Sequence, residues 1–204
     1  MLAAAALEHL PPAARVLLAA TAIALFVVDA GIGWLVGDRT AGPWQSSSRD
    51  RGSYQVVAVG TVGGFLLGFA ALRGVPDLHW LGNVWIWVIG GLLVAWCGVA
   101  LRGWAIATLG QSFRRVVTVT AGQQVVTRGP YRFVRHPSYT GLLLAFLGFG
   151  LAVDNPLALL GLVVPATAAL LYRIRVEEAA LEAELGEPYR DFERGRARLV
   201  PHVW

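Results

Sequence analysis

Five apolar segments, each close to the length that crosses a lipid bilayer, constrain this chain more than any other feature. A hydrocarbon core of roughly 30 Å needs about 20 mostly apolar residues per helix, or somewhat fewer where protein covers the helix ends. The segments are 16–36, 55–72, 84–101, 139–153 and 157–172. Charged residues make up 15% of the chain, against about 25% in typical soluble proteins. We therefore expect an all-α, polytopic integral membrane protein with five transmembrane helices.

The last two segments predict a tight helical hairpin, because only Asp154 and Asn155 separate them. Pro156 suits the first turn of the returning helix, where its missing N–H costs nothing. No helix breaker follows Tyr172 before Gly186. We expect the last helix to continue into the cytoplasm as a C-terminal extension that stops at this glycine.

A glycine pattern in the second segment predicts how it packs. Gly60, Gly64 and Gly68 recur at four-residue spacing and so share one helix face. Small residues let helix backbones approach closely in lipid, so this face should be a packing seam with no chemistry of its own.

The placement of arginine, the basic residue used throughout, predicts the orientation. Arginines gather in 37–54, in 102–136 and after 172, whereas the loop 73–83 holds one and the hairpin tip none. Basic loops tend to stay in the cytoplasm. We expect the N-terminus outside and the first loop, the third loop and the C-terminus inside. No basic region precedes the first segment, so we expect it to remain as an anchor rather than a cleaved signal peptide.

The polar chemistry lies in the second half of the chain. We divide the chain into an N-terminal anchor of three transmembrane helices, 1–101, and a catalytic region, 102–204. The basic residues flank apolar runs rather than forming a basic face with exposed aromatics, so we expect no nucleic-acid partner. The single Cys97 excludes an intrachain disulfide. The four histidines, at positions 9, 79, 136 and 202, are too scattered in sequence to predict a metal site, and we expect none.

The segment 129–141 is the first candidate site. It brings turn formers, tyrosines, a histidine and arginines together directly before the fourth span. Pro137 suits the first helical turn, so the free N–H groups after it would form an anion site, assisted by Arg135 or His136. An anchor of positive charge with interfacial tyrosines would have the same composition.

The second candidate is Arg173 with Glu177 and Glu178. Residues four apart share a helix face, so Arg173 and Glu177 should project together while Glu178 turns about 100° away. Such a pair is often an ordinary surface ion pair. Its place at the inner end of a span favours a function, because charges there are costly to bury.

Taken in order, these motifs resemble the isoprenylcysteine carboxyl methyltransferase family, part of a superfamily that also contains membrane phospholipid N-methyltransferases. The motifs are Gly129-Pro130-Tyr131, Arg135-His136-Pro137-Ser138-Tyr139-x-Gly141, Asn155-Pro156, Arg173 with Glu177-Glu178, and Gly186-x-x-Tyr189 through Arg198-Leu199-x-Pro201. The resemblance covers about 102–201.

The resemblance implies S-adenosyl-L-methionine as the cofactor, bound near the cytoplasmic ends of the last helices and capped by the tail. The family's cofactor contacts fall on Gln123, Gln124, Val125, Val126, Tyr131, His136, Pro137, Ser138, Tyr139 and Glu177, and the anion-site argument adds Arg135. The family's substrate-positioning arginine falls on Arg173.

These roles agree with the chemistry of the residues. The cofactor's ammonium needs an acceptor, which Glu177 supplies, and its carboxylate needs donors, which His136 and the helix N–H groups supply. Arg173 would hold an acceptor carboxylate bidentately. That carboxylate is already ionised at neutral pH, whereas an amine acceptor would need a base, for which Glu178 is the candidate.

We therefore predict an S-adenosylmethionine-dependent methyltransferase that O-methylates the carboxylate of a prenylated or other amphiphilic acceptor from the lipid bilayer. Phospholipid N-methylation and S-methylation of a small thiol are alternative reactions. A membrane scaffold that keeps the fold without catalysis is the non-enzyme alternative.

Overall fold

The computed structural model describes residues 7–36, 50–75, 77–110 and 125–201. Over these ranges the chain is helical, without a named strand, and the predicted all-α class is confirmed. The elements are α2 (Pro12–Val36), α3 (Ser53–Gly74), α4 (Val84–Leu109), a one-turn 3-10 helix η2 (Gly129–Arg132), α5 (Pro137–Ala152), α6 (Pro156–Leu185) and α7 (Glu187–Arg194).

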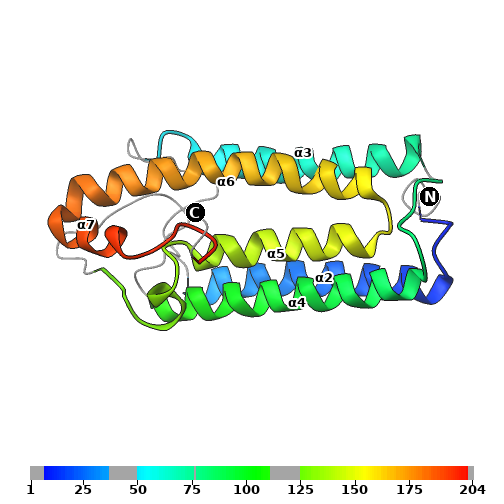
Figure 1. Cartoon of the computed structure of the whole chain (residues 1–204), viewed down its shortest axis with the longest axis horizontal. Coiled ribbons are helices and arrows are strands. Elements are labelled where there is room, and N and C mark those ends of the chain that lie inside the picture. Colours follow the sequence, from blue (N-terminus) through cyan, green and yellow to red (C-terminus); the bar gives the residue numbers. More distant parts are fainter. Residues whose placement is uncertain (1–6, 37–49, 76, 111–124, 202–204) are drawn as a thin grey trace.

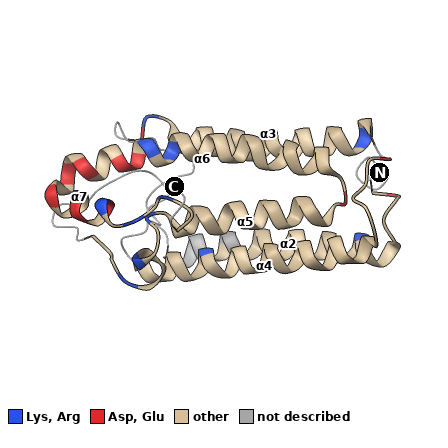
Figure 2. Cartoon of the chain, in the orientation of Figure 1, with Lys and Arg blue, Asp and Glu red and all other residues tan. Residues whose placement is uncertain are grey.

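Helices α2 to α6 run side by side along the long axis of the molecule and alternate in direction (Figure 1). Residues 50–52, 125–136 and 186–201 therefore lie at one end of the bundle, and residues 7–11, 77–83 and 153–155 lie at the other. Figure 2 shows most of the described charges at the first of these ends, which also holds α7, while the middle of α3, α5 and α6 carries none. This distribution is typical of a bundle whose middle lies in lipid.

Three of the described helices, α3, α4 and α6, are long and apolar enough to cross a membrane. Two more apolar stretches are shorter, namely α5 and residues 12–28 of α2. The membrane character expected from sequence is thus present in the helices.

Glycines join the helices into two close pairs. On α3, a Cβ at Gly64 would lie 2.8 Å from the Leu162 carbonyl oxygen of α6, and one at Gly60 would lie 2.5 Å from the Ala169 Cβ. A Cβ added at Gly68 would likewise lie close to the Ala158 carbonyl oxygen. The predicted seam on the second segment is therefore confirmed, and α6 is its partner.

The second pair, α4 with α5, has a seam that the sequence analysis did not single out. A Cβ at Gly98 would lie 2.5 Å from the Gly141 carbonyl oxygen, and one at Gly91 would lie 2.5 Å from the Gly148 carbonyl oxygen. At such distances only glycine fits between the backbones. The beginning of α5, which carries Ser138 and Tyr139, is thereby fixed against α4.

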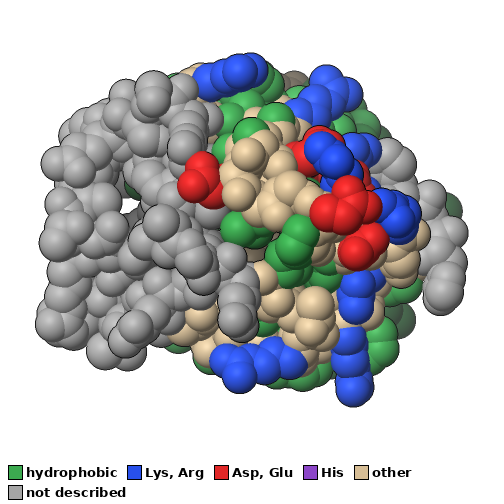
Figure 3. Space-filling model, turned by 90° about the vertical axis from the view of Figure 1, so that its left-hand side faces the viewer, with side chains coloured by type: hydrophobic (Ala, Val, Ile, Leu, Met, Phe, Trp, Pro, Cys, Tyr) green, Lys and Arg blue, Asp and Glu red, His purple; other side chains and the backbone are tan. Residues whose placement is uncertain are grey.

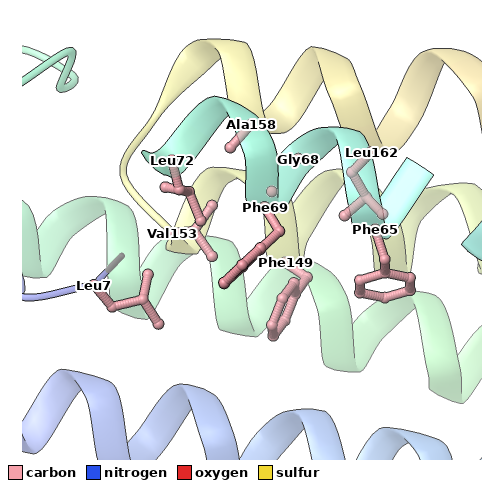
Figure 4. A pocket seen from close by; sticks show the side chains of 10 residues that line it. Leu7, Phe65, Gly68, Phe69, Leu72, Phe149, Val153, Ala158 and Leu162 are labelled. Carbon is pink, nitrogen blue, oxygen red and sulfur yellow. The ribbon is translucent and has the colours of Figure 1, made fainter. Parts of the chain in front are cut away.

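A cavity of about 150 Å³ lies between α3, α5 and α6. Phe65 and Phe69 of α3 and Phe149 of α5 line it, together with Leu162 of α6 (Figure 4). Apolar cavities of this size stay dry and accept apolar molecules. The cavity therefore suits hydrocarbon rather than water.

The helix ends follow the sequence signals closely. α5 begins at Pro137 and α6 begins at Pro156, with the Asn155 side chain capping the Ala158 N–H at 2.9 Å. α6 continues to Leu185 and stops at Gly186, whose φ of 61° favours glycine.

α4 is longer than the predicted segment, which ended at 101, because the charged side chain at position 102 is accommodated. Arg102 donates a 2.8 Å hydrogen bond to the Ser138 hydroxyl. A long basic side chain that reaches a polar partner in this way lets the helix continue past it.

Candidate active site

The candidate site lies at the end of the bundle that carries α7. It is formed by residues 50–53, η2, the first turn of α5, residues 173–178 of α6 and the tail after α7. Figure 3 views the bundle from this end and shows acidic and basic side chains gathered close together on its described part. Opposite charges this close together are typical either of a binding site or of a structural network of ion pairs. The distances between the side chains show which residues form such networks.

One network is a hydrogen-bonded chain from Arg173 through Tyr139 to Glu177. Arg173 Nε donates to the Tyr139 hydroxyl at 2.9 Å, and this hydroxyl donates to Glu177 Oε2 at 2.6 Å. Arg173 is 5% exposed. The predicted proximity of Arg173 and Glu177 is thus realised with a tyrosine of α5 between them, so that α5 and α6 share the site.

The other side of Arg173 is held by residues that sequence reasoning missed. Its NH1 donates to Asp50 Oδ1 at 3.0 Å and to the Ser53 hydroxyl at 2.9 Å. Asp50 also accepts from the Tyr54 N–H at 3.2 Å and so caps the first turn of α3. The predicted N-terminal anchor therefore contributes directly to the site. Asp50 and Arg173 lie 123 positions apart, and an acidic residue among loop arginines gave no signal of the pairing.

A second network surrounds Glu178. Its Oε1 lies 2.8 Å from Arg135 NH1 and 3.1 Å from His136 Nε2, and its Oε2 accepts from Arg198 Nε at 2.9 Å. We refer to these four residues as the Glu178 cluster. Glu178 is buried, so that removal of any cation would leave a poorly compensated charge. The cluster ties α6 to the entrance of α5 and to the tail.

The Glu178 cluster contains Arg135 and His136, both of which were expected to bind a ligand carboxylate. Both face Glu178, because α5 and the tail pack against the side of α6 that carries Glu178, a side that the helical spacing alone left unassigned. Their role at a ligand carboxylate stays a prediction.

Main-chain hydrogen bonds dock the tail onto the segment before α5. Arg135 N–H donates to the Ala197 carbonyl at 2.8 Å and His136 N–H donates to the Arg198 carbonyl at 2.9 Å. The Thr140 hydroxyl donates to the Leu199 carbonyl at 2.8 Å. The Tyr139 and Thr140 N–H groups bond to the His136 carbonyl, so fewer amides face outward than the predicted anion site requires.

Two buried tyrosines, Tyr131 of η2 and Tyr189 of α7, complete this end of the bundle, which we call the mouth of the site. Burial raises the pKa of the Tyr131 hydroxyl, and the charge of Glu177 raises it further. Burial also raises the pKa of Tyr189, and Glu178 adds to the effect. Both hydroxyls therefore stay neutral. The Tyr189 oxygen is buried, and within the described part of the chain it has no hydrogen-bond partner, which is unusual for a buried polar group.

The other residues predicted to bind the cofactor lie in the segment before η2 and at the start of α5, and their role stays a prediction. Val125 and Val126 are half-buried in the segment before η2. Pro137 and Ser138 are buried at the start of α5, with Ser138 held by Arg102. Gln123 and Gln124 lie outside the described residues.

Comparison with known proteins agrees with this geometry. The model of the isoprenylcysteine carboxyl methyltransferase (ICMT) family matches residues 90–183. The match contains Arg135 to Tyr139 and Arg173 to Glu178, and the resemblance inferred from the motifs is confirmed. Asp50 and Ser53, which hold Arg173, and Arg198 of the Glu178 cluster lie outside the matched residues.

Individual relatives extend the match. A protein-S-isoprenylcysteine O-methyltransferase of Tribolium castaneum is 29% identical over 152 residues, which are 74% of this chain and 52% of the relative. The enzyme named A of Arabidopsis thaliana is 32% identical over 64% of this chain and 64% of its own length. The chain therefore spans about half to two thirds of the length of these family members.

A solved structure of the eukaryotic intramembrane Ras methyltransferase ICMT is also similar. It has a TM-score of 0.52 and 28% sequence identity, and the match covers 74% of this chain and 52% of that one. The helical arrangement is thus shared with a membrane protein of the isoprenylcysteine carboxyl methyltransferase family.

Proposed function

We propose that this chain is a membrane methyltransferase that uses S-adenosyl-L-methionine to O-methylate the carboxylate of a prenylated or other amphiphilic acceptor. The observation that carries the proposal is the chain of hydrogen bonds from Arg173 through Tyr139 to Glu177. It sets a buried cation beside a carboxylate at one mouth, which suits an anionic acceptor next to a cationic donor molecule. The names of the relatives, protein-S-isoprenylcysteine O-methyltransferases, support the same reaction.

The residues at this mouth fit S-adenosylmethionine. Glu177 is a carboxylate with capacity for several donors, so it accepts from an ammonium in addition to Tyr139. Tyr131 with Val125 and Val126 offers aromatic and apolar surface. The buried Tyr189 hydroxyl, which has no partner among the described residues, is a polar group that a ligand would satisfy. When bound, the cofactor supplies a methyl group already activated by a sulfonium.

The protein then has to position the acceptor rather than to provide a nucleophile. Arg173 is held by Tyr139, Asp50 and Ser53, which fixes its guanidinium before an acceptor arrives. An acceptor carboxylate is ionised at neutral pH and needs no base. Both oxygens of Glu178 already accept from cations, which makes it a weak base. Its predicted role as a base would apply only to an amine acceptor.

The acceptor's hydrocarbon chain has a place in the bundle. Leu162 lines the cavity between α3, α5 and α6, eleven helical positions before Arg173, which corresponds to about 16 Å along α6. We place the acceptor's carboxylate at Arg173 and its chain between the helices toward this cavity.

The membrane arrangement follows from the same assignment. We propose that α2 to α6 all cross the bilayer, with the N-terminus outside and the site and C-terminus in the cytoplasm. The support is that arginine-bearing segments lie at the α7 end of the bundle (Figure 2), as the distribution of positive charge requires. The division into an anchor, 1–101, and a catalytic region, 102–204, is kept, with the addition of Asp50 and Ser53 to the site.

Methyl transfer with chosen acceptors tests this function. Purified protein in detergent is incubated with methyl-labelled S-adenosylmethionine and N-acetyl-S-farnesylcysteine, phosphatidylethanolamine or a small alkyl thiol. We expect label on the farnesylcysteine that mild base releases as methanol, as for an ester. Base-stable label on the amine lipid, or label on the thiol alone, would replace this proposal by one of the other reactions. Absence of both transfer and calorimetric binding of S-adenosylhomocysteine would identify a non-catalytic scaffold.

Two variants with matched controls assign the residues. Glu177→Ala should weaken S-adenosylhomocysteine binding, whereas Glu184→Ala, at an exposed site on the same helix, should not. Arg173→Ala should mainly raise the KM for the acceptor, with the exposed Arg175→Ala as its control. Equal small effects of Glu177→Ala and Arg173→Ala in folded protein would contradict the assignment.

A further inference from the structure

Two histidines and an aspartate converge at the end of the bundle opposite to the candidate active site. One possible ligand atom from each of His9, His79 and Asp154 lies within 4.8 Å of the other two. They come from three separate segments, namely the stretch before α2, the connection between α3 and α4, and the turn between α5 and α6. Sequence distance hid this cluster, since His79 and Asp154 alone are 75 positions apart.

Contacts within the cluster fix its geometry. The imidazole rings of His9 and His79 are stacked, with centroids 4.4 Å apart. His79 Nδ1 lies 3.8 Å from Asp154 Oδ2, and the other carboxylate oxygen, Oδ1, accepts from the Trp80 N–H at 3.2 Å. Asp154 is thus oriented toward the histidines by a backbone donor, as an outer partner orients a metal-binding carboxylate.

His9 carries the observation that points to a ligand. Its Nε2 is buried and has no hydrogen-bond partner among the described residues. The ring also forms a hydrogen bond with the Val153 backbone. A histidine that bonds the backbone and keeps its other nitrogen unused has the arrangement of a metal ligand.

A purely structural network is the simpler interpretation, and it explains the contacts of Asp154 but not those of His9. Leaving a buried polar nitrogen without a hydrogen-bond partner is unfavourable. A cation between the three side chains accounts for the unused nitrogen, the approach of the two rings and the facing carboxylate together.

We propose that His9, His79 and Asp154 form a zinc site that ties the segment before α2 to the two connections at this end of the bundle. Imidazole nitrogens and a carboxylate oxygen are standard zinc ligands at about 2.0–2.2 Å, with a water completing the tetrahedron. Two atoms on one zinc ion are therefore at most about 4 Å apart, so donors within 4.8 Å need only small side-chain rotations. His79 is 33% exposed and Asp154 7%, which leaves a path for the ion.

Metal analysis of the full chain tests the site. The protein is purified in detergent with any affinity tag removed, stripped with a chelator, and titrated with zinc by calorimetry. We expect one zinc ion per chain, loss of this binding in His79→Ala and Asp154→Asn, and its retention in Asp77→Asn, an exposed aspartate of the same connection. Cobalt in place of zinc should give the intense visible absorption of tetrahedral coordination, which a loosely bound surface ion does not give.

Thermal unfolding provides a second, independent measurement. A chelator should lower the melting temperature of the native protein and leave that of His79→Ala unchanged, because a ligand that binds only the folded state raises its stability. Equal zinc binding in native protein and His79→Ala, or no binding at all, would overturn the proposal. If His79→Ala does not fold, the Asp154→Asn comparison and the cobalt spectrum of the native protein decide.

Discussion

The seam between α4 and α5 gives a sharp test, because two adjacent glycines of α4 face different surroundings. A Cβ added at Gly91 would lie 2.5 Å from the Gly148 carbonyl oxygen and 2.6 Å from the Ala152 amide nitrogen, both backbone atoms of α5. A Cβ added at Gly90 would have nothing within 4 Å. Gly91→Ala and Gly90→Ala therefore add the same methyl group to the same helix. At Gly91 the methyl group meets the backbone of α5, whereas at Gly90 it points into open space.

The two substitutions are expected to change the free energy of unfolding in opposite directions. An alanine in place of glycine in a helix interior stabilises it by roughly 0.5–1 kcal/mol, and this is the whole effect at Gly90. At Gly91 the backbones must separate, and overpacking of this kind costs typically 1–3 kcal/mol. We expect Gly91→Ala to unfold at a lower temperature than the native protein, and Gly90→Ala at the same or a higher one.

Thermal unfolding of both variants in the same detergent, followed by circular dichroism at 222 nm, measures the difference. Equal melting temperatures for the two variants would refute the packing of α4 on α5 described above, whatever the function of the protein.

Three further predictions concern the site. Asp50→Asn should lower the free energy of unfolding by up to roughly 3–5 kcal/mol, as for a broken buried ion pair, which thermal unfolding measures. It should also raise the KM for the acceptor more than the Kd for the cofactor. An unchanged KM in steady-state kinetics would show that Asp50 does not contribute to the site. Glu178→Gln should release the tail, so limited proteolysis should cut after α7 faster than in Glu182→Gln, whose carboxylate lies at the surface. Tyr189→Phe should not lower the stability of the free protein, since the buried hydroxyl has no described partner. It should weaken S-adenosylhomocysteine binding about 2- to 10-fold, as for one lost hydrogen bond of about 0.5–1.5 kcal/mol, and unchanged calorimetric affinity would remove Tyr189 from the cofactor site.

The sequence predicted local features well because each had a local cause. Pro137 and Pro156 mark helix starts, Gly186 marks a stop, and the Gly64 face packs against another helix, all as expected from rules that act over a few residues. The length of α4 was underestimated, because the partner that accommodates its arginine, Ser138, comes from a later segment.

Long-range pairing is where sequence reasoning failed. Asp50 with Arg173, and His9 with His79, meet only because helices that alternate in direction return distant segments to the same end. Helical spacing also gave the direction of Glu178 without the identity of its neighbours. The sequence therefore pointed to the two candidate motifs, while their hydrogen-bond partners could come only from the fold.

The two glycine seams have a consequence for how the helices of the bundle are held together. They fasten α3 to α6 and α4 to α5, and between α5 and α6 the tight glycine contact is at Gly150, beside the turn. At the far end of these two helices, the Tyr139 hydroxyl connects them through Arg173 and Glu177. A molecule that competes for this hydroxyl would therefore weaken one of two links between α5 and α6 at this end of the bundle, because the Glu178 cluster forms the other.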